Sequence, residues 1–299
     1  MPSARLGPTA APPKIRVGDL TIHCLDGGGL WLDGGAMFGI IPKPIWSKLV
    51  RVDVVNRIPL ATTCFLTDVA GKKVLVETGT GPALKYEDKE RGFFSFSDHW
   101  IVTSLEAIGV SREQIDLVIL THLHFDHAGG GTMPDGRGGY LPTFPRAKYV
   151  VQRGEWDDAV TAHAVMTGTY RPQNLAPLEA AGVLSFVENS AAEIVPGISV
   201  RPMPGHTRHQ QAVVLESGGS RAILPADLMP TAAHVGLRYN MAYDLMPFEN
   251  MVNKKAFLQN ATQRGDLLLV GQDPGEVCWR SSRQADGRFT LTPVGAAAD

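Results

Sequence analysis

The run from Thr121 to Gly130 constrains this chain more than any other, because His122, His124, Asp126 and His127 fall within six residues. Neutral imidazole nitrogens and carboxylate oxygens are the ligands that zinc and similar ions prefer. A catalytic zinc site typically takes three protein ligands and a water molecule. The alternative is a loop of solvated histidines without a metal, but such a loop would not need so many ligand-type residues so close together. The run therefore predicts part of a metal site.

An apolar, β-branched segment precedes this run, and glycines follow it. Residues 115–120 read Ile-Asp-Leu-Val-Ile-Leu, and residues 129–131 are all glycine. This pattern predicts a buried strand that ends in a loop. On a strand, His122 and His124 would share one face, whereas a loop lets the pairs 122/124 and 126/127 surround two different points. Two neighbouring ions are therefore expected.

Three more polar groups come directly after segments that are predicted as strands. They are His206 after 198–203, Asp227 after the hairpin 212–225, and Gln272 after 266–271. The hairpin is indicated by two apolar runs separated by Ser-Gly-Gly-Ser, a strong turn signal. The sequence thus brings side chains of ligand type to several strand ends.

The order of these residues resembles the metallo-β-lactamase superfamily. The family motif is His-x-His-x-Asp-His, then a distant His and a bridging Asp, and it matches His122, His124, Asp126, His127, His206 and Asp227 in order. The family's last histidine has no match, because Gln272 stands there. Residues 73–79 resemble the family's strand followed by Asp-Thr-Gly, with Glu77 in place of the aspartate. The resemblance implies an α/β fold, an αββα sandwich of two packed mixed β-sheets flanked by helices.

Three segments are similar to the branch of the superfamily that contains quorum-quenching N-acyl homoserine lactonases, esterases and phosphotriesterases: 32–44, 143–147 and 239–247. The resemblance implies an enzyme, a metallo-hydrolase that opens lactone or ester bonds with metal-activated hydroxide. An N-acyl homoserine lactonase is the specific expectation, and an organophosphate hydrolase of the same fold is the alternative. A catalytically impaired ligand-binding protein is the alternative from another class.

The resemblance also implies roles for the ligands. His122, His124 and His206 would hold one zinc-like ion, and a second would lie at Asp126, His127 and Asp227. Asp227 would bridge the two ions, and Asp126 would accept the proton of the attacking water, so these two aspartates are the expected catalytic residues.

Gln272 lacks the imidazole nitrogen that zinc favours, so the second site should bind its ion more weakly. Three outcomes stay open: one ion, two ions with water or Gln272 completing the second site, or a fold that has lost activity. Zinc is the expected metal, and manganese, cobalt and iron are alternatives.

Aromatic residues in segments that do not look like strands predict an apolar pocket that accepts an acyl group. The candidates for substrate contact are Phe38, Trp46, Tyr239, Tyr243, Phe248 and the cluster 93–96, together with His234, which could also swing in as a substitute ligand. For any single aromatic, packing of loops over the core is the competing interpretation. Together they favour an uncharged small-molecule ester or lactone over a sugar phosphate.

Composition excludes several partners. The chain has 299 residues and a net charge of −2, without an extended basic stripe, so nucleic acid is not an expected partner. It has no apolar run near the roughly 18 residues of a membrane span, so no membrane association is expected. The three cysteines lack metal-ligand spacing and are predicted to be buried thiols. The helical pattern 251–263 would place Lys254 and Lys255 on a solvated face.

A single domain is expected over residues 14–299, since the ligands run from 122 to 272 and no linker separates two halves. Residues 1–13 are expected to form a flexible tail, because they are rich in proline and alanine. They have no apolar signal-peptide core, so a cytoplasmic location is the default. A homodimer is an expectation drawn from the resemblance alone.

Overall fold

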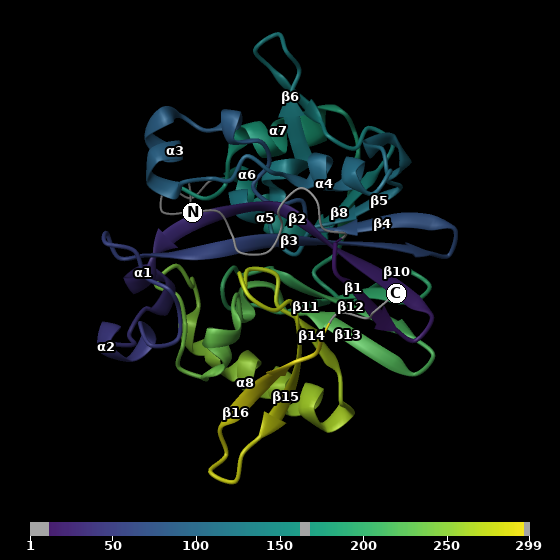
Figure 1. The fold of residues 1–299 in the computed structure, drawn as a ribbon. Coiled ribbons are helices and arrows are strands. Elements are labelled where there is room, and N and C mark those ends of the chain that lie inside the picture. The colour runs from purple at the N-terminus through teal and green to yellow at the C-terminus, as the bar shows by residue number, and fades with distance from the viewer. Residues whose placement is uncertain (1–11, 162–167, 296–299) are drawn as a thin grey trace.

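Two mixed β-sheets pack face to face, and helices cover their outer faces (Figure 1). The computed structural model describes residues 12–161 and 168–295. Within these ranges each large sheet has seven strands. The αββα sandwich expected from the sequence is confirmed. The predicted tail, apart from its last two prolines, lies outside the described residues.

The first sheet has the strand order β1-β2-β3-β4-β5-β8-β9. Its strands are β1 (Lys14–Val17), β2 (Leu20–Asp33), β3 (Arg57–Val69), β4 (Lys72–Val76), β5 (Leu117–Ile119), β8 (Lys148–Gln152) and β9 (Leu184–Val187). The first four strands pair antiparallel, and β4, β5, β8 and β9 pair parallel. Because parallel neighbours end at the same edge, the ends of β4 and β5 lie side by side.

The second sheet has the order β10-β11-β12-β13-β14-β15-β16. Its strands are β10 (Ala192–Val195), β11 (Ile198–Pro202), β12 (Gln211–Ser217), β13 (Ser220–Leu224), β14 (Leu267–Leu269), β15 (Cys278–Arg283) and β16 (Phe289–Pro293). Only β13 and β14 pair parallel among these described strands. The predicted strands before His206, Asp227 and Gln272 correspond to β11, the β12–β13 hairpin and β14, which confirms them. A short hairpin of β6 (Thr132–Pro134) and β7 (Tyr140–Pro142) stands apart.

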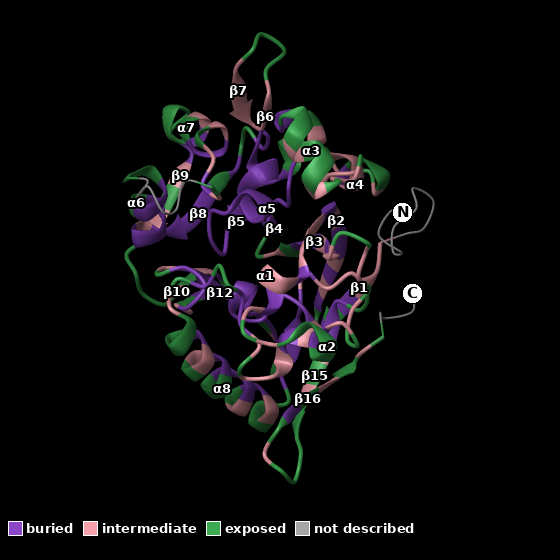
Figure 2. Cartoon of the chain, turned by 90° about the vertical axis from the view of Figure 1, so that its left-hand side faces the viewer, coloured by how far each residue is buried: buried purple, intermediate pink, exposed green. Residues whose placement is uncertain are grey.

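The helices divide between the two outer faces, as Figure 2 shows from a second direction. Near the first sheet lie α3 (Asp88–Phe94), α4 (Ile101–Ala107), α5 (Phe125–Ala128), α6 (Arg153–Thr161) and α7 (Pro172–Ala180), and α8 (Pro247–Arg264) covers the second sheet. The short helices are α1 (Gly34–Phe38), α2 (Lys43–Trp46), η1 (Ala83–Lys85), η2 (Arg112–Gln114), η3 (Gly129–Gly131), η4 (Ala226–Leu228) and η5 (Ala232–Val235). None of the described helices combines the length and the apolar character that crossing a bilayer requires.

Alternating side chains divide the core into layers. In β4, Val74 and Val76 join the layer between the sheets, whereas Leu75 packs toward the helices of the first sheet. Strand β14 repeats the pattern against α8. Successive side chains on a strand point to opposite faces, so a sheet covered on both faces requires continuous apolar runs. The three cysteines are buried free thiols, as predicted.

The prediction of a solvated face at 254 and 255 is wrong for Lys254. Lys255 is exposed, but the Lys254 side chain is fully buried. Its ammonium donates a hydrogen bond to the carbonyl oxygen of Tyr239 at 2.8 Å and another to that of His234. The loop packed on α8 supplies these acceptors, and periodicity along the helix cannot reveal them.

Candidate metal centre

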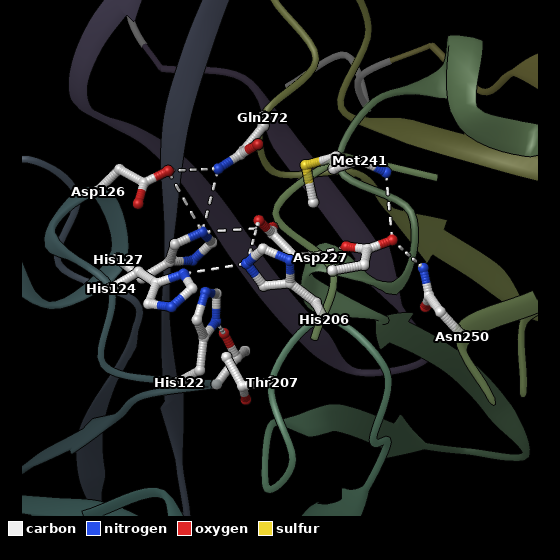
Figure 3. A network of polar contacts seen from close by, with 12 residues as sticks. His122, His124, Asp126, His127, His206, Thr207, Asp227, Met241, Asn250 and Gln272 are labelled. Carbon is white, nitrogen blue, oxygen red and sulfur yellow. Dashed lines mark hydrogen bonds and ion pairs between the residues drawn. The ribbon is translucent and has the colours of Figure 1, made fainter. Parts of the chain in front are cut away.

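The predicted ligands meet where strand ends of the two sheets converge (Figure 3). His122 and His124 lie just beyond β5, Asp126 and His127 lie in α5, and Asp227 lies in η4. His206 and Gln272 follow β11 and β14. All seven side chains belong to buried residues, the most exposed being only 8% accessible. The structure thus brings together every ligand predicted from the sequence.

The first cluster consists of His122, His124 and His206. Their ligand nitrogens lie within 4.8 Å of one another, and His206 Nε2 is 3.0 Å from His124 Nδ1. His122 Nδ1 is 3.0 Å from the Thr121 hydroxyl, but its Nε2 is buried without a hydrogen-bond partner. A buried imidazole nitrogen without a partner is costly, so this cluster fits a divalent ion that takes its lone pair.

The second cluster adjoins the first. His122, His127 and Asp227 also place ligand atoms within 4.8 Å of one another. Asp227 Oδ1 is 3.3 Å from His127 Nε2, and its Oδ2 is 3.5 Å from His206 Nε2. The Asp227 carboxylate therefore lies between the two clusters, the position in which a bridging ligand would stand.

Gln272 closes one side of the second cluster. Its Nε2 donates a hydrogen bond to Asp126 Oδ2 at 2.6 Å and lies 3.1 Å from His127 Nε2. Asp126 Oδ2 itself is 3.7 Å from His127 Nε2. An amide nitrogen has no free lone pair, so Gln272 does not present a ligand atom in this orientation.

Glu77 fixes the orientation of His127. Its Oε2 is 3.0 Å from His127 Nδ1, and its Oε1 accepts a hydrogen bond from the Thr121 backbone at 2.8 Å. Glu77 has a φ of 67°, a left-handed conformation that costs energy for a residue other than glycine and that concentrates at functional sites. The glutamate at this position therefore links the ends of β4 and β5 to a ligand.

Two further buried carboxylates hold the first cluster. Asp244 Oδ1 is 2.9 Å from His206 Nδ1, which directs the other ring nitrogen toward the cluster. Glu155 accepts hydrogen bonds from the Leu123 backbone and from the hydroxyl of Thr207, each next to a ligand histidine. Burial raises the pKa of Glu155. These contacts set the ring orientations before any ion binds.

The electrostatics of the centre favour a cation. Burial first, and then neighbouring imidazoles, hold the pKa values of His122 and His124 well below the usual range, so both rings are neutral. Burial acts the same way on His127, but nearby carboxylates, Asp227 foremost, outweigh it and raise its pKa. For Asp227, burial is outweighed by imidazoles, and its pKa is lowered. Positive charge is therefore stabilised where His127 and Asp227 meet.

The family follows from comparison with known proteins. The sequence pattern described as "Metallo-beta-lactamase superfamily" matches residues 57–272 of this chain. The chain belongs to the metallo-β-lactamase superfamily.

Relatives within the superfamily share this fold. An N-acyl homoserine lactonase of Bacillus cereus is 26% identical over 178 residues, 56% of this chain and 64% of that protein, so the match spans less than two thirds of the relative. The crystal structure of a probable metal-dependent hydrolase from Staphylococcus aureus is 30% identical, with a TM-score of 0.84, over 94% of this chain and 99% of that one. AidC, described as a dizinc quorum-quenching lactonase, is 18% identical and shares the fold over 98% of this chain and 100% of its own, with a TM-score of 0.79.

A pocket of about 350 Å³ opens onto the metallo-β-lactamase centre. Its polar end includes His124, Asp126, His206, Asp227 and Gln272. Most of its wall is apolar, formed by Leu32, Met37, Phe93, Phe94, Phe125, Met241 and Tyr243. No lysine or arginine is among the described residues that line it. The pocket therefore suits a small, largely uncharged molecule.

Only some of the predicted substrate-contact residues line the pocket, and Phe248 is one that does not. Tyr243 lines the pocket, as do Phe93 and Phe94 of the predicted cluster. Phe38 and Trp46 do not, because they are fully buried and stack on each other with ring centroids 5.1 Å apart. Tyr239 meets the edge of the Phe38 ring and also lies outside the pocket lining. These three residues pack beneath the pocket wall and do not line the pocket.

His234 is neither a substitute ligand nor a pocket residue. Its ring is fully buried and stacks on Phe38. Nδ1 lies 2.7 Å from the Thr231 hydroxyl, and Nε2 lies 2.8 Å from the carbonyl oxygen of Met37. Both ring nitrogens are thus occupied, which corrects the expectation from sequence.

Sequence reasoning missed Asp244 and Glu155 as supports of this metallo-β-lactamase centre. Asp244 lies in the segment 239–247 that carries the family resemblance, so a carboxylate there was a visible signal. Glu155 shares one side of α6 with the buried Trp156 and Ala159. A charged residue within an apolar helix face is a signal that can be read from sequence, although its partners cannot.

Proposed function

We propose that this protein is a metal-dependent hydrolase that opens lactone or ester bonds, and that N-acyl homoserine lactones are substrates. The observation that carries the proposal is the pocket with a largely apolar wall that opens directly onto the histidine and aspartate clusters. The name of the Bacillus cereus relative supports the lactone class.

The metal proposed for the first cluster is zinc, held by His122, His124 and His206. Three imidazole ligands with an open position are typical of catalytic zinc. A divalent ion there supplies Lewis-acid chemistry, because it polarises a carbonyl and makes a water molecule acidic enough to attack at neutral pH. The buried carboxylate of Asp244 keeps His206 in the tautomer that offers Nε2 to the ion.

Asp126 and Asp227 are the proposed catalytic residues. Both line the pocket. Burial raises the pKa of Asp126, which makes its carboxylate a better acceptor for the proton of the attacking water at neutral pH. Gln272 orients that carboxylate through its hydrogen bond to Oδ2. Asp227 stands between the clusters and stabilises positive charge beside the reacting carbonyl.

The substrate class follows from the wall of the pocket. Phe93, Phe94 and Tyr243 offer apolar surface to an acyl chain. A phosphorylated or carboxylated substrate needs a cationic partner. The described lining residues supply none, so we infer an uncharged ester or lactone with an apolar chain.

A substrate panel with zinc-loaded protein tests the proposal. The panel contains acyl homoserine lactones of different chain length, γ- and δ-lactones, aryl esters, paraoxon and a cephalosporin. We expect the highest kcat/KM for acyl homoserine lactones, measured by proton release and by chromatography of the ring-opened product. His206→Ala should abolish turnover, and His99→Gln, which removes a histidine outside both clusters, should leave it unchanged.

Other outcomes have defined meanings. A preference for paraoxon would contradict the lactonase proposal and would indicate a phosphotriesterase that uses the same centre. Turnover of no compound by protein with bound zinc would favour a ligand-binding protein and would contradict the proposal.

A further inference from the structure

Gln272 occupies a position that its backbone fixes. Its N–H donates to the carbonyl oxygen of Pro230, and its own carbonyl oxygen accepts from the N–H of Ala61. The residue is only 3% accessible. Two hydrogen bonds therefore hold the backbone of Gln272, and its side chain reaches the second cluster from the segment just beyond β14.

The amide nitrogen of Gln272 faces Asp126 and His127. Figure 3 shows it turned toward Asp126 and His127, with the amide oxygen turned away. The distances are 2.6 Å to Asp126 Oδ2 and 3.1 Å to His127 Nε2. An amide NH₂ group only donates, so it pairs with the Asp126 carboxylate.

Asp126 decides the orientation of this amide. The reverse amide orientation would set the Gln272 oxygen 2.6 Å from a carboxylate oxygen, which is repulsive. His127 has carboxylates on both sides, because Glu77 Oε2 is 3.0 Å from Nδ1 and Asp227 Oδ1 is 3.3 Å from Nε2. The contact with Asp126 therefore turns the amide nitrogen, which has no free lone pair for a metal ion, toward the second cluster.

This geometry conflicts with a second ion. An ion at Asp126 and His127 would need to stand about 2.0–2.2 Å from their ligand atoms. The Gln272 nitrogen already stands in contact with both atoms and offers no lone pair to an ion. To admit an ion, the amide has to turn its oxygen inward and give up its hydrogen bond to Asp126. In the described structure Oε1 is buried and accepts no hydrogen bond.

We propose that the Gln272 amide takes the place of a second metal ion, so that the chain holds one ion, at His122, His124 and His206. The NH₂ group orients Asp126 and stands beside His127, where a second ion would otherwise lie. The proposal rests on the proposed function only for the presence of the first ion. It resolves the alternatives at Gln272 in favour of a one-metal centre.

Metal stoichiometry tests the proposal without substrate. Metal-stripped wild-type protein is titrated with Zn²⁺ by calorimetry, and bound zinc is measured by elemental analysis after desalting. We expect one tightly bound ion per chain and a second affinity at least about 100-fold weaker. Two ions of similar affinity in wild-type protein would overturn the proposal.

Gln272→Glu is the sharpest variant, because it keeps the side-chain shape but replaces the donor with a carboxylate. Without metal, it sets two carboxylates against each other, so Tm should fall. With zinc, it should bind two ions and regain Tm. Gln284→Glu, on the exposed β15–β16 turn, makes the same chemical change away from the centre and should still bind one ion. A Gln272→Glu protein that is stable without zinc and binds one ion contradicts the proposal.

Gln272→His provides a second variant in case the glutamate variant does not fold. It should raise the bound zinc from about one to two ions per chain. Unchanged stoichiometry in this folded variant would mean that Gln272 does not control the second cluster. One bound ion in wild-type protein without turnover of any ester would support the one-metal inference and contradict the proposed function. Two tightly bound ions with turnover would contradict the one-metal inference and support the proposed function.

Discussion

The carboxylate of Glu155 accepts a hydrogen bond from the hydroxyl of Thr207 at 2.7 Å. The same carboxylate accepts from the Leu123 backbone at 3.1 Å. Thr207 follows His206, and Leu123 lies between His122 and His124. One buried side chain on α6 thus joins the two ligand segments of the first cluster, which come from different sheets.

Glu155→Ala should therefore loosen the first cluster. It leaves three donors without this acceptor, the Leu123 backbone and the hydroxyls of Thr207 and Tyr170, so the free energy of unfolding should fall by roughly 2–4 kcal/mol. Zinc affinity should fall about 10 to 100-fold. Chelator competition measures the affinity, and urea unfolding measures the stability. Glu155→Gln keeps one acceptor oxygen and can exchange donor and acceptor with the Thr207 hydroxyl, so it should stay near wild type. Unchanged zinc affinity in the alanine variant would refute this role.

Asp244→Asn should weaken the hold on His206. The two oxygens of Asp244 accept from His206 on one side and from Met241 and Asn250 on the other. An asparagine must set its NH₂ group against one of these donors. We expect zinc affinity to fall about 10 to 100-fold, measured by chelator competition. Asp286→Asn on an exposed turn is the matched control, and an equal effect of both variants would count against the contact with His206.

His234 should make stability depend on pH below neutrality. Burial lowers the pKa of this ring to about 4, whereas an unfolded histidine titrates near about 6.5. Between these values the unfolded chain binds more protons, so stability is full above pH 6.5 and is lost as the pH falls toward 4, by on the order of 3 kcal/mol. Urea unfolding of metal-free protein at several pH values measures this loss. His234→Gln should show a shallower slope, and parallel slopes for the two proteins would exclude the effect.

Phe94→Ala should change the preference for acyl chain length. The Phe94 ring lines the pocket and packs against Phe93 and Phe125. Each buried methylene contributes about 0.8 kcal/mol. Loss of this wall should raise KM about 10-fold more for a decanoyl than for a butanoyl lactone, with kcat little changed. Phe248→Ala, at an exposed position outside the pocket, is the control. An equal change of KM for both chain lengths would show that the acyl chain lies elsewhere.

Much of the fold could be read from local patterns. The apolar runs before His122, His206, Asp227 and Gln272 predicted strands, and the structure has a strand at each. Such runs are informative because a strand in a sheet that is covered on both faces needs apolar side chains on both of its faces. Pocket residues were harder to predict. Phe38 and Trp46 end the short helices α1 and α2, and Tyr243 lies in a loop. All three are aromatic residues outside the strands, yet only Tyr243 lines the pocket.

By itself, the sequence predicted a metal centre, since His122, His124, Asp126 and His127 lie within one short segment, and their resemblance to the metallo-β-lactamase motif predicted the fold. Only the tertiary structure decided how Gln272 acts there. Its partner Asp126 is 146 residues away, and the orientation of the amide depends on the carboxylate that it meets there. Hydrogen-bond direction between distant segments is set by packing, and no local sequence pattern encodes it.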